Sequence, residues 1–124
     1  MVLVDTSIWI RLLANHAPHA QRLDQLLARD EVLGHELVHG ELLIGATSRR
    51  AALLVDYVRM EQAPVVQHDE VVAFVKARAL AGRGIGWIDA QLLASALVGR
   101  SALCTADAAL AKAADELGVA YVAG

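Results

Sequence analysis

The chain has 124 residues, of which 56% are apolar, and a formal net charge of −3. This length predicts a single domain over residues 1–124 with one substantial core. The charge argues against nucleic-acid binding through a generally basic surface, and no apolar run reaches the length of about 18 residues that a membrane span needs.

Strand and helix signals alternate along the chain. The apolar run at 2–4 stops at Asp5-Thr6-Ser7, a cluster suited to capping a helix, and 82–86 form the one glycine-rich loop. In chain order we expect a strand at 2–4, helices at 8–14 and 19–28, a strand at 32–35, helices at 36–47 and 50–60, an extended piece at 63–67, helices at 69–80 and from 89, a strand at 103–104, a helix at 108–117 and a closing strand at 119–122.

Short apolar strands separated by helices predict an α/β fold of three layers, α/β/α, with a central parallel sheet covered on both faces. Ligands of such folds bind beyond the carboxyl ends of the strands. Asp5 and Asp107 each follow a predicted strand, and Asp89 begins a helix that would face the same edge. The predicted fold therefore brings distant acids to one rim.

Four acidic residues follow or interrupt apolar runs: Asp5, Glu41, Asp89 and Asp107. A buried carboxylate is costly unless it is paired, hydrogen-bonded or bound to a metal. Asp5, Asp89 and Asp107 could be only helix N-caps, but this explanation does not apply to Glu41. Glu41 lies in the middle of an expected helix, where Leu37 and Ile44 predict a face that is at least half buried.

Clustered carboxylates repel one another, and a divalent cation reverses that balance. A ligand set of oxygens without thiolates favours Mg²⁺ or Mn²⁺ over zinc. Mg²⁺ retains several waters, one of which can attack a phosphodiester. The hydroxyls of Thr105, Thr6 and Ser7 could hold a carboxylate or a water. These residues predict a metal-dependent hydrolase.

Other chemically active side chains give weaker signals. The single cysteine, Cys104, excludes an intramolecular disulfide and should be a small buried side chain. Trp9 and Trp87 are expected in the core or an interface rather than as base-stacking platforms. Among the histidines only His39 could approach the acids. All five are expected at surface or edge positions: His16, His19, His35, His39 and His68.

The start of the chain lacks the basic flank of a signal peptide, so we expect a cytoplasmic protein. The high apolar share also predicts an apolar face that is covered by another copy or by a partner.

Four motifs make the sequence recognisable: Val-Asp-Thr-Ser-Ile-Trp at 4–9, Glu-Leu-Leu-Ile-Gly at 41–45, Asp-Ala-Gln-Leu-Leu-Ala-Ser-Ala at 89–96 and Thr-Ala-Asp at 105–107. In this order, and over the whole chain, they resemble the PIN-domain family, and more narrowly the VapC toxins of bacterial VapBC toxin–antitoxin pairs. The resemblance implies an endoribonuclease dependent on Mg²⁺ or Mn²⁺, with metal-binding acids at Asp5, Glu41, Asp89 and Asp107. Thr105 matches the family's hydroxyl residue before the last acid.

The resemblance also implies a homodimer and a VapB-type antitoxin that blocks the acidic pocket, often with a basic side chain. Many relatives carry a further acid or a bulky aromatic residue shortly after the Thr-x-Asp motif, whereas Ala108, Ala109 and Leu110 follow here. This difference implies that a second metal, if used, binds weakly or only with substrate.

Our interpretation is an RNA-cleaving toxin in which Arg83, on the glycine-rich loop, grips the backbone. A receiver-like phosphoacceptor is one alternative, although it needs a lysine beyond a late strand and Lys76 and Lys112 lie in expected helices. A phosphatase of the Asp-x-Asp type lacks its second acid, since Ser7 stands there. The other alternative is a non-enzymatic binding module in which the acids are only caps.

Overall fold

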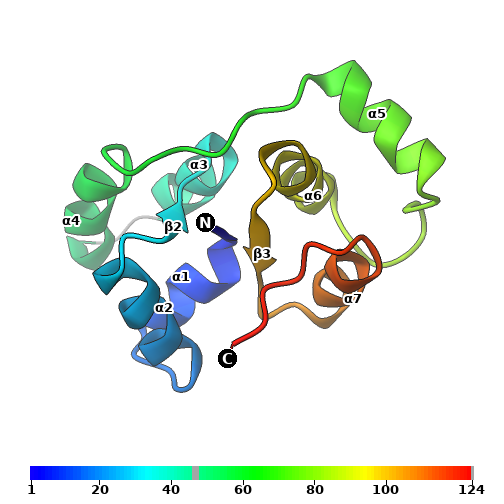
Figure 1. The fold of residues 1–124 in the computed structure, drawn as a ribbon. Helices are drawn as coiled ribbons and strands as arrows, with labels where there is room; N and C mark the ends of the chain where they lie inside the picture. Colours follow the sequence, from blue (N-terminus) through cyan, green and yellow to red (C-terminus); the bar gives the residue numbers. More distant parts are fainter. Residues whose placement is uncertain (46–47, 124) are drawn as a thin grey trace.

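The computed structural model describes residues 1–45 and 48–123, and Figure 1 shows the arrangement of their helices and strands. In chain order these are β1 (Val2–Val4), α1 (Thr6–Leu13), α2 (His19–Ala28), β2 (Val32–Leu33), α3 (Glu36–Ile44), α4 (Ser48–Tyr57), α5 (His68–Ala77), α6 (Trp87–Gly99), β3 (Ala102–Cys104) and α7 (Ala108–Glu116). None of the helices in these residues is long and apolar enough to cross a membrane.

The three strands form a parallel sheet in the order β2-β1-β3. Helices α1 to α4 gather on one side of the strands and α5 to α7 on the other (Figure 1). This arrangement confirms the predicted α/β/α layers around a central parallel sheet. It also puts β1, the first strand, in the middle of the sheet.

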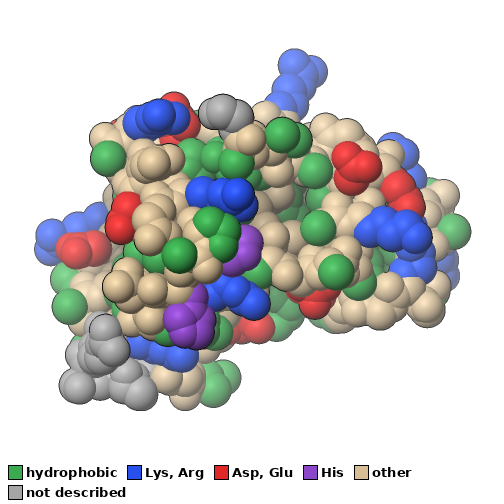
Figure 2. All heavy atoms as spheres, turned by 90° about the horizontal axis from the view of Figure 1, so that it is seen from below, with side chains coloured by type: hydrophobic (Ala, Val, Ile, Leu, Met, Phe, Trp, Pro, Cys, Tyr) green, Lys and Arg blue, Asp and Glu red, His purple; other side chains and the backbone are tan. Residues whose placement is uncertain are grey.

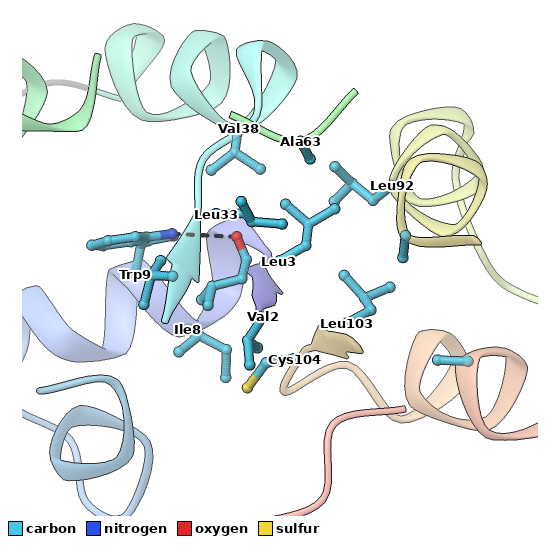
Figure 3. Packing of buried hydrophobic residues seen from close by; sticks show 14 of the residues in the cluster. Val2, Leu3, Ile8, Trp9, Leu33, Val38, Ala63, Leu92, Leu103 and Cys104 are labelled. Carbon is cyan, nitrogen blue, oxygen red and sulfur yellow. Dashed lines mark hydrogen bonds between the residues drawn. The ribbon is translucent and has the colours of Figure 1, made fainter. Parts of the chain in front are cut away.

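The core lies between the sheet and the helices on its two sides. Leu3 and Val4 of β1 and Trp9 of α1 are completely buried, and Leu92 of α6 is 1% exposed. The indole Nε1 of Trp9 donates a hydrogen bond to the Val4 carbonyl over 3.3 Å (Figure 3). Cys104 is buried too, and burial raises the pKa of its thiol to about 11. The expectations for Trp9 and Cys104 are therefore confirmed.

The closing strand predicted at 119–122 is wrong in extent, because only a single parallel bridge joins Ala120 to Leu103. The reason is the shortness of β3, since the backbone groups of successive strand residues point to alternate neighbours. Ala102 donates to the Met1 carbonyl and Cys104 accepts from Asp5, both toward β1. Only Leu103 faces outward, where it donates to Val119 and accepts from Tyr121.

Helix positions follow the predictions, with shifts that local contacts explain. The predicted helix at 19–28 is confirmed as α2. Helix α1 begins earlier than predicted, at Thr6, because the Asp5 side chain caps its first N–H groups. Helix α5 ends before residue 80 because Ala79 has a φ of 51°, which breaks the helix. Helix α3 ends at Ile44, and the predicted last residue, Thr47, lies outside the described residues.

His35 contradicts the expectation of surface or edge histidines, since its side chain is completely buried. Its Nδ1 accepts the Leu37 N–H over 3.1 Å, which caps α3. The proton of the neutral ring is therefore on Nε2, which donates to the Ser95 hydroxyl over 2.9 Å. The Tyr57 hydroxyl accepts the His35 backbone N–H. His35 thus connects the start of α3 to α6 through its ring and to α4 through its backbone.

The buried imidazole should make folding stability depend on pH. Burial, which outweighs the opposing charge of Glu36, lowers the pKa of His35 below 6.5 in the folded protein. The unfolded chain then takes up the proton more readily, so stability should fall as pH decreases below about 6.5, by at most about 1.4 kcal/mol per pH unit.

Urea denaturation at about pH 7.5 and 5.5 measures this slope. A matched variant, His35→Asn, keeps an N-cap acceptor for α3 but has no titrating ring, and its stability should change less between the two pH values. Equal slopes for the two proteins would contradict the role assigned to His35.

Candidate active site

The four acids singled out in the sequence lie around one cavity of about 550 Å³. They come from four separate segments: the end of β1, the middle of α3, the first turn of α6 and the residue before α7. The full lining consists of Asp5, Thr6, Ser7, Ile10, Glu41, Asp89, Leu92 and Asp107. The parallel topology thus gathers carboxylates that are far apart in the sequence.

The acids differ in depth within the cavity. Asp5 is buried at its base, with 5% of its surface exposed. Asp89 is half-buried, and Glu41 and Asp107 are exposed. The predicted half-buried face around Glu41 is wrong, because α3 buries Val38 and Leu42 instead and leaves Ile44 92% exposed. The cavity is therefore a funnel with a buried carboxylate at the bottom and two solvated carboxylates at the rim.

Asp5 is held by hydrogen bonds to both carboxylate oxygens. Its Oδ1 accepts the Ser7 N–H at 3.0 Å, the Ser7 hydroxyl at 2.5 Å and the Ile8 N–H at 3.4 Å. Its Oδ2 accepts the Thr105 hydroxyl at 2.5 Å. Hydrogen bonds to an ionised carboxylate compensate for its burial. These contacts fix the carboxylate in one orientation.

The hydroxyls of Ser7 and Thr105 also join the two sides of the cavity. The Ser7 Oγ accepts the Ala106 N–H at 3.1 Å, and the Thr105 Oγ1 accepts the Asp107 N–H at 3.0 Å. Asp107 in turn accepts the Leu110 N–H at 2.9 Å and so caps α7. The segment after β3 is therefore tied to the start of α1 at several points.

The two remaining acids each have one defined contact. The Thr6 hydroxyl donates to Glu41 Oε1 at 2.6 Å, which links α1 to α3. Asp89 Oδ2 accepts the Gly86 N–H at 3.0 Å, so this acid lies in the third position of α6 and is not its N-cap. Three of the four acids therefore support a helix start, and only Glu41 has no capping role.

Electrostatic repulsion within the cluster is visible at Asp89. Burial raises the pKa of its carboxyl, whereas the Gly86 N–H opposes that change. The negative charges of Asp5, Asp107 and Glu41 raise it further. All three other acids therefore act on Asp89 through the same cavity, and a bound cation would relieve the repulsion.

The donor set fits a hydrated magnesium-like ion rather than a closed metal cage. Among residues 1–45 and 48–123, no three carboxylate, imidazole or thiol groups converge closely enough to surround one ion. Mg²⁺ is commonly bound through one or two carboxylates and keeps several waters. Four carboxylates around an open cavity, with one oriented by hydroxyls, meet that requirement without closer convergence.

Three other residues considered from the sequence, His39, Arg83 and Trp87, are not part of this lining. The ring of His39 stacks on Tyr57 with centroids 6.1 Å apart and is not part of the cavity lining. The guanidinium of Arg83 forms an ion pair with Glu116 of α7 at 2.6 Å. Trp87 is 42% exposed, so it is not a core residue.

Sequence reasoning missed the contribution of the connections between elements. The backbone N–H of Gly86, at the end of the glycine-rich loop, is what positions Asp89. His35 and Ser95 connect α3 and α6, the helices that carry Glu41 and Asp89. A polar residue directly before the predicted helix at 36–47 was the only available signal for His35.

Comparison with known proteins agrees with this geometry. A sequence profile of the PIN domain matches residues 2–116, which include all four acids. The chain is 48% identical over 121 residues to proteins named Ribonuclease VapC32 in Mycobacterium tuberculosis strains CDC 1551 / Oshkosh and ATCC 25618 / H37Rv. Each alignment covers 97% of this chain and 95% of the relative.

The hydrogen bonds of Asp5 can be separated from its charge by two substitutions. Asp5→Asn and Asp5→Ala both remove the negative charge, but only Asn keeps an acceptor for the Ser7 N–H. We expect Asp5→Ala to be less stable than Asp5→Asn by about 1–2 kcal/mol, the usual value of an N-cap. Urea denaturation without divalent cations measures the difference, and equal stabilities would show that the contacts contribute nothing.

Proposed function

The chain belongs to the PIN-domain family, and we propose that it is a metal-dependent endoribonuclease that serves as the toxin of a VapBC-type toxin–antitoxin pair. The observation that carries this proposal is the gathering of Asp5, Glu41, Asp89 and Asp107 around one cavity. The relative named as a ribonuclease, which aligns over nearly the whole chain, supports the same activity. The catalytic unit is one nuclease domain.

We propose that the four acids hold Mg²⁺ or Mn²⁺ and that Thr105 orients Asp5 within this set. When bound, the ion would neutralise charge on the phosphate and lower the pKa of a water. Asp5 would be the ligand with the least freedom, because both of its oxygens accept hydrogen bonds. The exposed Glu41 and Asp107 leave the rim open, so a long RNA chain can enter.

A second cavity, of about 410 Å³, supports contact with the RNA backbone beside the acids. Its lining includes His19, Arg22, Tyr121 and Thr105, and Thr105 also contacts Asp5. Burial lowers the pKa of His19, and the nearby positive charges of Arg11 and Arg22 lower it further. The two arginines would supply the positive charge beside this cavity. Figure 2, which views the molecule from below Figure 1, shows histidine side chains next to Lys or Arg side chains. This cavity, rather than Arg83, is our candidate for phosphate contact.

The proposed protein partners are a VapB-type antitoxin and a second copy of the chain. Exposed apolar side chains near the ends of two adjacent helices support an interface: Leu43 and Ile44 of α3, Val55 of α4, and Val58 just beyond it. A phosphoacceptor or phosphatase is disfavoured, since Lys76 and Lys112 lie within α5 and α7 and the chain aligns with a ribonuclease.

The activity is tested by cleavage of single-stranded RNA with Mg²⁺ or Mn²⁺. We expect Asp5→Asn to reduce cleavage by about 100-fold or more, because a metal ion contributes several kcal/mol to phosphoryl chemistry. Asp56→Asn, an exposed substitution of the same kind on α4, is the control and should cleave normally. Cleavage that survives both Asp5→Asn and EDTA would overturn the proposal.

Metal binding is tested independently of cleavage by thermal unfolding. Mg²⁺ at a hundredfold excess over its Kd should stabilise the native chain by about 2.7 kcal/mol. A variant with both Asp5→Asn and Asp89→Asn should gain far less, because two of the four carboxylates have lost their charge. A binding module whose acids are only caps would show no stabilisation by Mg²⁺ in either protein.

A further inference from the structure

Trp87 is an exposed aromatic side chain at the edge of the acidic cavity. It is the first residue of α6, two positions before Asp89, and 42% of its surface is exposed. Together with Glu41, Gly86, Ile88 and Asp89 it lines a shallow depression of about 580 Å³. An indole ring therefore borders two of the carboxylates that form the candidate metal site.

The same indole also borders an apolar hollow. This cavity, of about 340 Å³, lies between α5, the loop before α6 and the first turn of α6. It is lined by Val75, Leu80, Ala81, Ile85, Gly86, Trp87 and Ala90. Trp87 and Gly86 thus separate an acidic depression from an apolar one, and both open beside the same ring.

The indole of Trp87 also contacts the imidazole ring of His68, the first residue of α5. The two ring centroids are 5.1 Å apart and the planes are inclined by 52°. This contact supports the orientation of Trp87 while leaving a large part of the indole exposed. The exposed ring is therefore oriented and not merely at the end of a free side chain.

We propose that an unpaired RNA base next to the scissile phosphate stacks on Trp87 and rests against the apolar hollow. The inference depends on the proposed ribonuclease function, which puts the scissile phosphate beside Glu41 and Asp89. A base next to that phosphate would then lie within reach of Trp87, which lines the same depression as Glu41 and Asp89. Stacking of a base on an aromatic side chain tolerates any base, because each has a π-face. Trp87 is thus a substrate-binding residue that favours single-stranded RNA.

The first experiment uses an RNA oligonucleotide whose cleaved bond has been mapped with the native chain. Trp87→Ala should raise KM roughly tenfold to a hundredfold, the range of a lost base-stacking contact, while Trp87→Phe should recover most of the affinity. Val98→Ala, an exposed apolar substitution at the far end of α6, is the matched control and should be unchanged.

A substrate change then tests the stacking partner directly. Replacing the base on one side of the cleaved bond by an abasic residue should raise KM for the native chain by a similar factor. The same replacement should change KM of Trp87→Ala very little, because the contact is already lost. The effect of the abasic residue on the native chain is measured without any variant, so poor folding of Trp87→Ala cannot hide that effect.

A binding readout separates stacking from effects on catalysis. Trp9 is completely buried, so acrylamide should quench mainly the fluorescence of Trp87. With Asp5→Asn, in which cleavage should be slow enough for a binding measurement, single-stranded RNA should protect that fluorescence, and the abasic oligonucleotide should protect it less. Gel filtration of Trp87→Ala shows whether the substitution alters self-association.

Three results would overturn the inference: an unchanged KM in Trp87→Ala, equal effects of the abasic residue in both proteins, or a changed oligomeric state that accounts for the loss. In the last case the indole covers a second copy of the chain and not a base. If the native chain cleaves no RNA with either metal, the proposed function fails and the inference fails with it. Normal cleavage with unaffected Trp87 variants would leave the function intact and reject only the inference.

Discussion

The hydrogen-bonded carboxylate of Asp5 is the interaction on which the rest of the site depends. It is buried directly after the central strand, where an ionised group without partners would cost several kcal/mol. Its partners come from α1, through Ser7 and Ile8, and from the segment after β3, through Thr105. The charge therefore joins two parts of the fold at the place where the sheet ends.

Repulsion among the four acids limits how closely the fold can bring them together. Each of Asp5, Asp89 and Asp107 offsets part of that repulsion by accepting a backbone N–H at the start of a helix. Glu41 has no such contact and remains in solvent, where its charge is screened. Each of these three acids thus stabilises a helix start, while their negative charges together oppose folding; a bound cation would relieve that repulsion.

The sequence was informative where structure is decided by neighbours in the chain. The apolar run of β1, the cap at Asp5 and the helix at His19–Ala28 are local features, and their order sufficed to bring the acids to one edge. The hydrogen bond from His35 to Ser95 spans 60 positions, so no local pattern announced it.

Exposure on one face of a helix was equally hard to predict. It depends on which face packs inward, and Leu37 and Ile44 gave the wrong face because Val38 and Leu42 are the buried residues of α3. Trp87 differs in the same way, since it is 42% exposed whereas Leu92, Leu93 and Ala96 further along α6 are buried.

The pairing of β1 with β3 restricts where residues can be inserted into this chain without loss of the site. Val4 is level with Cys104, and from that register the Thr105 hydroxyl reaches Asp5 across 100 positions of sequence. A shift of one residue would move the strand by about 3.3 Å and turn its side chains to the opposite faces, which would present Ala106 or Cys104 in place of Thr105. The register of β1 and β3 thus determines which side chain contacts Asp5. A single added residue in β3 would therefore disrupt the carboxylate cluster without changing any of its members.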